Sequence, residues 1–150
     1  NAVCDNIDIL KAAKVPIILT PHPGEMARLC NTTVKEVQKD RLGVAKAFSK
    51  KYGITVVLKG SGTIIVSPEF SGAYINRTGN AGMARGGSGD VLSGIIGAFV
   101  AQGLDIGSAT VAAVFIHGLA GDESARRLSV RGMTPTDMIN ELPLLLSNFE

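Results

Sequence analysis

The segment formed by residues 79–94 combines the residue types that could hold an anion with a possible base. Its sequence is G-N-A-G-M-A-R-G-G-S-G-D-V-L-S-G, and an apolar run with helical periodicity continues to Val100. Glycine lets the backbone take positive φ and approach a ligand closely, and the first N–H groups of a helix carry the positive end of its dipole. We therefore predict an anion hole at Gly86, Gly87, Ser88 and Gly89.

Asp90 follows this loop and needs a role of its own, because a carboxylate repels a phosphate. A base that takes a proton from a hydroxyl, while backbone amides hold the transferring phosphoryl group, accounts for both features. The alternative is that Asp90 is the N-cap of the helix. The segment matches neither the P-loop pattern nor the dinucleotide-binding glycine pattern, so those two classes are excluded.

His22 and Lys59 each follow a short apolar segment typical of a buried strand. Residues 17–20 lead into P-H-P-G-E, and residues 54–58 lead into K-G-S-G-T. Open α/β sheets bind ligands at the carboxyl ends of their strands. We therefore predict ligand binding by His22, and binding of an anion or nucleotide by the loop Lys59, Gly60, Ser61, Gly62 and Thr63. The alternatives are a locally bonded turn histidine and a solvated lysine at a hairpin turn.

The elements that must position these residues alternate between helix and strand. We expect helices over residues 1–14, after Gly24, from the Thr33 and Glu36 capping box to Gly53, after Asp90, after a cap at Ser108, and from Thr134 onward; strands are expected at 17–20, 54–58, 63–66 and 73–75. Gly94, Gly97, Gly118 and Gly121 indicate close approach of neighbouring elements. His117 has no metal-ligand partner within helical reach, so we assign it a structural role and predict no metal site built from protein ligands.

Composition excludes several classes of protein. A length of 150 residues fits one domain with a sizeable core, and 45% hydrophobic with 19% charged residues is typical of a soluble globular protein. A net charge of +2 without a basic patch gives no indication of nucleic-acid binding. Cys4 and Cys30 form no C-x-x-C, which fits a reducing cytoplasm. No signal peptide or membrane-spanning apolar stretch is visible, so we expect no membrane partner.

Three motifs in this order resemble those of the ADP/ATP-dependent NAD(P)H-hydrate dehydratases of the ribokinase-like superfamily: T-P-H-P-G-E, K-G-S-G-T and G-N-A-G-M-A-R-G-G-S-G-D. G-x-G-D alone indicates only the superfamily, and T-P-H-P-G-E with G-N-x-G-M-A narrows it to the dehydratases. The resemblance runs from about residue 15 to 103. It implies an α/β fold with a doubly wound, mostly parallel sheet flanked by helices, in which residues 1–150 are a single domain forming the C-terminal part.

The resemblance also implies a metabolite repair reaction. Such enzymes are lyases that restore NADH or NADPH from the hydrated form and consume ADP or ATP, with Mg²⁺ as cofactor. By this likeness Asp90 is the catalytic base and contacts the substrate, as does His22. Residues 59–63 and Gly89 then bind the adenine nucleotide. Magnesium ordinarily binds through substrate phosphates and water, which agrees with the absence of a carboxylate cluster in the motifs.

One departure from the family pattern leaves alternatives open. Members have further N-terminal βα units that we do not find here, so we expect part of the sheet and of the substrate pocket to be missing, with exposed sheet edges covered by a partner. We expect a homo-oligomer, since similar proteins form tetramers. Two alternatives are a vitamin-precursor kinase of the same superfamily and a nucleotide-binding fragment that is catalytically incomplete.

Overall fold

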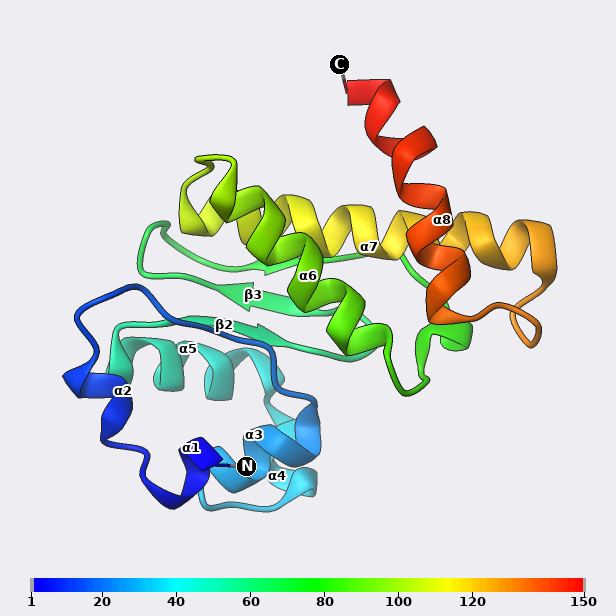
Figure 1. Cartoon of the computed structure of the whole chain (residues 1–150). Coiled ribbons are helices and arrows are strands. Elements are labelled where there is room, and N and C mark those ends of the chain that lie inside the picture. The colour runs from blue at the N-terminus through cyan, green and yellow to red at the C-terminus, as the bar shows by residue number, and fades with distance from the viewer. Residues whose placement is uncertain (1, 150) are drawn as a thin grey trace. The chain divides into compact units, whose positions relative to one another are not determined.

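The computed structural model describes residues 2–149, and Figure 1 shows their helices and strands. The chain forms two compact units, residues 1–75 and 76–150. The single domain predicted from the sequence stays a prediction, and each unit is described by itself. The predicted strands all belong to the first unit, and the glycine-rich loop with its helix belongs to the second.

The first unit contains a four-stranded sheet in the order β1-β2-β3-β4. Its elements are α1 (Ala2–Asp5), α2 (Ile9–Ala12), β1 (Ile18–Leu19), α3 (Pro23–Leu29), α4 (Val34–Lys39), α5 (Arg41–Tyr52), β2 (Thr55–Leu58), β3 (Ile64–Val66) and β4 (Tyr74–Ile75). β1 and β2 are parallel, with Ile18 opposite Thr55, whereas β2, β3 and β4 pair antiparallel. The described sheet is therefore mixed rather than mostly parallel. The reason is that helices connect β1 to β2, whereas short turns join the later strands, and short turns can join only antiparallel neighbours.

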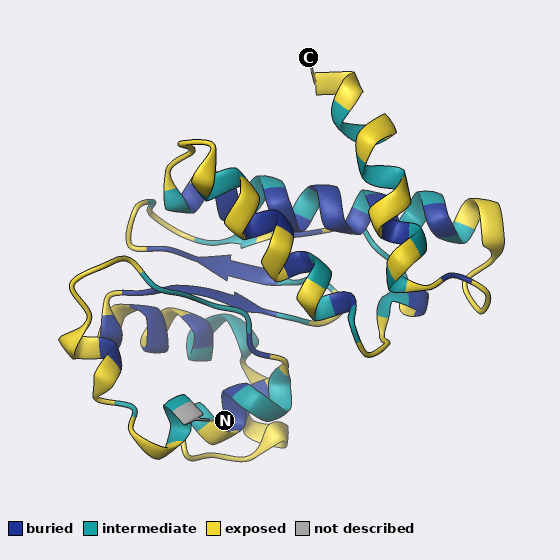
Figure 2. Ribbon diagram, viewed as in Figure 1, coloured by how far each residue is buried: buried dark blue, intermediate teal, exposed yellow. Residues whose placement is uncertain are grey.

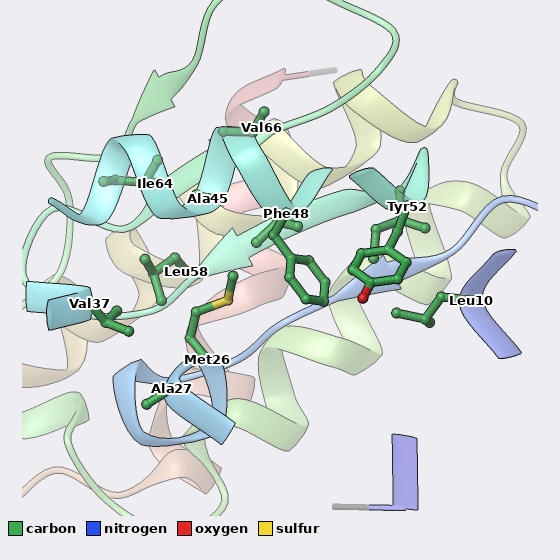
Figure 3. Close-up of a cluster of buried hydrophobic side chains, with 12 residues drawn as sticks. Leu10, Met26, Ala27, Val37, Ala45, Phe48, Tyr52, Leu58, Ile64 and Val66 are labelled. Carbon is green, nitrogen blue, oxygen red and sulfur yellow. The ribbon is translucent and has the colours of Figure 1, made fainter. Parts of the chain in front are cut away.

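A hydrophobic cluster fixes the helices of this unit against β2 and β3 (Figure 3). Met26 of α3 and Leu58 of β2 are fully buried in it. Phe48 and Tyr52, one turn apart on α5, pack with their ring centroids 4.6 Å apart. Figure 2 shows that both central strands are buried along their length. This packing holds the carboxyl ends of β1 and β2 in fixed positions.

Two of the predicted helices are broken. The expected helix over residues 1–14 consists of the short helices α1 and α2. The expected helix from Thr33 to Gly53 is interrupted at Asp40, whose backbone has φ −145° and ψ 70° and whose carboxylate accepts the N–H of Gly43 at 2.8 Å. Asp40 is thus the N-cap of α5, and this places Arg41 at the start of that helix.

The second unit is helical in its described part. It contains η1 (Ala81–Met83), α6 (Ser88–Ala101), α7 (Ile106–Leu128), α8 (Pro135–Leu146) and η2 (Ser147–Phe149). Asp105 rather than Ser108 is the N-cap of α7, because its carboxylate accepts the N–H of Ser108 at 2.8 Å. Ala120, Met133 and Met138 form a buried cluster where α7 and α8 pack. Within residues 2–149 no helix combines the length and the apolar composition needed to cross a bilayer.

Close approach is confirmed at two of the four predicted glycines. A Cβ on Gly118 would lie 2.0 Å from Oγ1 of Thr78, and one on Gly121 would lie 2.4 Å from the Met83 sulfur. A Cβ on Gly94 or Gly97 would meet no atom of the described chain within 4 Å. The prediction is wrong for those two positions as far as residues 2–149 are concerned.

The capping box of α8 makes the stability of the second unit depend on pH. The Asp137 carboxylate accepts the hydroxyl of Thr134 at 2.6 Å and its backbone N–H at 2.8 Å. Both hydrogen bonds lower the pKa of Asp137, and the bond from the Thr134 hydroxyl has the larger effect. Folding thus favours the charged form, so the stabilisation is complete above the ordinary Asp value of about 3.9 and is lost as the pH falls through the lower folded value.

We expect Asp137→Asn to unfold at lower urea concentration than the wild type at about pH 7, and this difference to shrink as the pH is lowered through the acid range. Urea titrations followed by circular dichroism at several pH values measure it. A difference between the two proteins that does not change with pH would contradict this explanation.

Candidate functional site

The first unit brings the His22 and Lys59 segments together. β1 and β2 are parallel neighbours, so their carboxyl ends lie at the same edge of the sheet. The backbone N–H of Lys59 donates to the carbonyl oxygen of Pro21 at 2.9 Å. The two motifs that the sequence placed after separate strands therefore form one continuous surface.

The imidazole of His22 is the N-cap of α3. Its Nδ1 accepts the N–H groups of Gly24 at 3.0 Å and Glu25 at 3.2 Å, and the Glu25 carboxylate accepts the N–H of His22 at 2.6 Å. An accepting Nδ1 in a neutral ring requires the proton on Nε2. The locally bonded alternative thus describes Nδ1 correctly. The side chain as a whole remains 57% exposed, and its Nε2 lies 3.7 Å from Glu25 Oε1.

Glu25 also lies next to the ammonium group of Lys59. The distance from Glu25 Oε2 to Lys59 Nζ is 3.8 Å, and the lysine side chain is 29% exposed. Residues 59–63 do join the antiparallel strands β2 and β3, as the hairpin alternative predicts, but the Lys59 side chain does not lie fully in solvent. The pair has no net charge, but it keeps the Lys59 ammonium group next to the loop of residues 60–63, where it could contact an anionic group of a ligand.

Arg41 is a residue of this surface that the sequence reasoning missed. Its Nη1 donates to the carbonyl of Ser61 at 2.6 Å, and its Nη2 donates to the carbonyls of Leu58 at 3.1 Å and Lys59 at 3.3 Å. Burial lowers the pKa of the Arg41 guanidinium from its ordinary value. These partners lie 17 to 20 residues away in the sequence, so no local pattern could have revealed the contact.

In the second unit, α6 begins at Ser88 with Gly87 as its N-cap. Gly87 has φ 92°, in the left-handed region that favours glycine, and has no side chain to cap the helix. Asp90 is then the third residue of the helix and is exposed. The alternative that Asp90 is the N-cap is wrong, and its carboxylate lies in the first turn, beside the amino end of the helix.

The backbone N–H groups of the predicted anion hole differ in whether they already have a hydrogen-bond partner. The N–H of Ser88 donates to the Arg85 carbonyl at 3.3 Å and so already has a partner. The N–H groups of Gly86, Gly87 and Gly89 make no hydrogen bond to any atom of residues 2–149. Those three glycine amides are the ones that an anion could engage.

Side chains of α7 hold the loop that precedes α6. The Asp122 carboxylate accepts the backbone N–H of Gly79 at 2.8 Å and the side-chain amide of Asn80 at 3.0 Å. His117, largely buried, has its Nε2 2.9 Å from the carbonyl oxygen of Ser88. This contact supports the structural role predicted for His117, because it fixes the first residue of α6. Asp122 was not predicted, since its partners lie more than 40 residues earlier.

Among residues 2–149 there is no group of three or more His, Cys, Asp or Glu side chains that could hold a metal ion. Mg²⁺ is commonly bound through phosphate groups and water rather than by a cluster of protein carboxylates. Cys4 and Cys30 are both free thiols. Burial raises the pKa of Cys30, which favours its neutral thiol form.

A family model described as NAD(P)H-hydrate dehydratase matches residues 1–144. The chain belongs to this family. The bifunctional NAD(P)H-hydrate repair enzyme Nnr of Moorella thermoacetica is 45% identical over 150 residues, which are 100% of this chain and 28% of the relative. The ADP-dependent (S)-NAD(P)H-hydrate dehydratase of Neisseria meningitidis is 50% identical over 106 residues, or 71% of this chain and 36% of the relative.

Solved structures confirm the ribokinase-like α/β class. The ADP/ATP-dependent NAD(P)H-hydrate dehydratase of Bacillus subtilis, co-crystallised with ATP/Mg²⁺, superposes with a TM-score of 0.85 at 35% identity. A ribokinase-like superfamily protein of Enterococcus faecalis gives 0.78 at 32% identity. The matches cover 90% and 91% of this chain, but only 48% and 46% of the two solved chains. The chain thus spans about half of these solved members of the class.

Proposed function

We propose that the protein to which this chain belongs dehydrates hydrated NADH or NADPH at the expense of ADP or ATP. The observation that carries the proposal is the position of Asp90: its carboxylate is exposed in the first turn of a helix whose N-cap is a glycine. A carboxylate without a capping role, next to unpartnered backbone amides, suits proton removal coupled to phosphoryl transfer. The family match supplies the substrate class.

In the proposed reaction the hydroxyl oxygen of the hydrate attacks the terminal phosphorus of the nucleotide. Asp90 accepts the hydroxyl proton, and the bond from this phosphorus to its bridging oxygen breaks. The leaving group is AMP when the nucleotide is ADP, and ADP when it is ATP. The carbon–oxygen bond of the phosphorylated hydrate then breaks, and the neighbouring carbon loses a proton. This step releases phosphate and restores the double bond of NAD(P)H.

The other residues are proposed to bind and orient the reactants. The N–H groups of Gly86, Gly87 and Gly89 hold the transferring phosphoryl group. Nε2 of His22 donates to the hydrated nicotinamide nucleotide, and the loop of residues 59–63 contacts the adenine nucleotide, with the Lys59 ammonium near its negative charge. Mg²⁺ bound to the phosphates would neutralise part of that charge.

The test is to mix the full-length protein with hydrated NADH and either ADP or ATP and to follow absorbance at about 340 nm, where the reduced nicotinamide absorbs. We expect absorbance to return only when nucleotide is present, with one phosphate released for each NADH formed. A stable phosphorylated product without NADH would instead indicate a kinase. No return of absorbance with either nucleotide would overturn the proposal.

Two further features are proposed with it. Free cysteines fit a reducing cytoplasm, and cell fractionation measures that location. A homo-oligomer would cover exposed apolar residues such as Ile75 on the edge strand β4. Light scattering of the purified protein measures its mass, and a monomer would contradict this.

A further inference from the structure

Arg41 occupies a position that does not favour a cation. It is the first residue of α5, where the helix dipole is positive and an arginine loses stabilisation. Within residues 2–149 its guanidinium makes no ion pair within 4.0 Å of a carboxylate, and its Nε is buried without a hydrogen-bond partner. The favourable interactions of this partly buried guanidinium are therefore its bonds to the backbone at the end of β2 and in the loop after it.

Those bonds determine which way the peptide units of the loop face. In a trans peptide the carbonyl of one residue and the N–H of the next point in opposite directions. The unit between Leu58 and Lys59 illustrates this: its carbonyl accepts from Arg41 and its N–H donates to Pro21 on the other side. Arg41 thus binds carbonyl groups on one side of the loop backbone, and the N–H groups of the same peptide units point to the other side.

The same geometry applies to the next two carbonyls that Arg41 binds. The carbonyls of Lys59 and Ser61 accept from the guanidinium, so the N–H groups of Gly60 and Gly62 point away from it. Neither of these N–H groups makes a hydrogen bond to any atom of residues 2–149. Both residues are at least partly exposed, so their amides are open to a ligand.

The backbone conformation of Gly60 and its lack of a side chain both fit the position of the Arg41 guanidinium. Its φ is 146°, which side-chain-bearing residues rarely adopt, and a Cβ there would lie 2.8 Å from Arg41 Nη2. The guanidinium therefore packs directly against the backbone of Gly60, in a space that a methyl group would occupy. The loop conformation and the arginine depend on each other.

We propose that Arg41 is a positioning residue for nucleotide binding: by holding the carbonyls of Leu58, Lys59 and Ser61, it directs the amides of Gly60 and Gly62 towards acceptor atoms of the adenine nucleotide. This inference rests on the proposed function in taking residues 59–63 as the nucleotide-binding loop. Arg41 itself does not touch the reacting atoms. Loss of Arg41 weakens nucleotide affinity and leaves the hydrated substrate unaffected.

The experiment compares Arg41→Ala and Arg41→Lys with the wild type in the full-length protein. Titration calorimetry with ADP measures binding without turnover, and steady-state assays give KM for ADP and for hydrated NADH. We expect Arg41→Ala to raise Kd and KM for ADP about tenfold or more, the loss expected when hydrogen bonds to a charged acceptor are misaligned, with KM for hydrated NADH unchanged. Lysine can bind fewer carbonyls than the guanidinium fork, so Arg41→Lys should recover part of the affinity.

Lys46→Ala is the matched control, because Lys46 is an exposed cation on the same helix. It should leave Kd for ADP unchanged. Gly60→Ala is a second variant that displaces the guanidinium while keeping its charge, and it should reproduce the loss of ADP affinity if Arg41→Ala does not fold. Unchanged ADP affinity in a folded Arg41→Ala or Gly60→Ala protein overturns the inference.

The outcome is separable from that of the proposed function. Arg41-dependent ADP binding without return of NADH would support the inference and overturn the dehydratase proposal. If NADH forms and Arg41→Ala leaves KM for ADP unchanged, the dehydratase proposal is supported and the inference about Arg41 is overturned. An equal rise in KM for both substrates would indicate general loss of structure and would contradict a positioning role for the nucleotide.

Discussion

Replacing Asp90 with Asn is expected to lower kcat for NADH formation by about 10²–10⁴-fold, the usual contribution of a general base. The amide is nearly the same size as the carboxylate but cannot accept the hydroxyl proton of the hydrate. Because Asp90 is exposed and does not cap α6, the substitution should not unfold the second unit. Steady-state assays of the full-length protein give the rate, and calorimetry with ADP shows whether nucleotide binding persists.

Asp137→Asn is a matched control for this experiment. Asp137 is likewise the third residue of its helix, but its carboxylate accepts the N–H of Thr134 in a capping box. The control should therefore lose stability and keep kcat, whereas Asp90→Asn should lose kcat and keep stability. If Asp90→Asn retains kcat within about tenfold of the wild type, Asp90 is not the base.

Substituting Gly118 with Ala is expected to destabilise the protein by about 1–3 kcal/mol, the usual result of overpacking a filled site. The new Cβ would lie 2.0 Å from Oγ1 of Thr78 and 2.8 Å from its backbone carbonyl carbon, so a side-chain rotation cannot relieve the contact. The Thr78 hydroxyl also donates to the carbonyl of Phe115 at 3.0 Å, which keeps it against α7. Thermal unfolding should show a Tm lower by roughly 2–4 °C for each kcal/mol lost.

Gly97→Ala tests the opposite case. A Cβ at Gly97, inside α6, meets no described atom within 4 Å. Alanine should therefore stabilise the helix by up to about 1 kcal/mol through its better helix propensity. A Gly118→Ala protein as stable as the wild type would show that Thr78 and α7 do not pack as described.

Signals that act over a few residues predicted the structure well. Thr33 and Thr134 cap the helices expected to follow them, and Gly53 ends α5 in a left-handed conformation. A capping hydrogen bond joins residues two or three apart, so the residues that make it are visible in the sequence. The β-branched and apolar residues at 54–58 likewise identified the buried strand β2.

Local signals failed where two of them competed. Thr33 and Gly53 are both helix-end signals, and the residues between them read as one helix, yet Asp40 starts a second helix within that stretch. Likewise Asp105 and Ser108 can both cap α7, and the aspartate does so. The residue types alone do not show which of two possible N-caps is used, because Asp, Ser and Thr are N-caps of similar strength. The packing of the folded helix selects between them.

By itself the sequence determined the types of the candidate site residues and their order, because glycines before Asp90 and polar residues after buried strands are local patterns. Only the tertiary structure decided which side chains hold these site residues in place. Arg41 binds the backbone of residues 59–63, and Asp122 binds the segment that begins at Gly79. The hydrogen bonds of these two side chains join residues at least 17 apart in the sequence. Such bonds form only after hydrophobic packing has brought separate elements together, so the loops of the site are specified locally and their orientations by the fold.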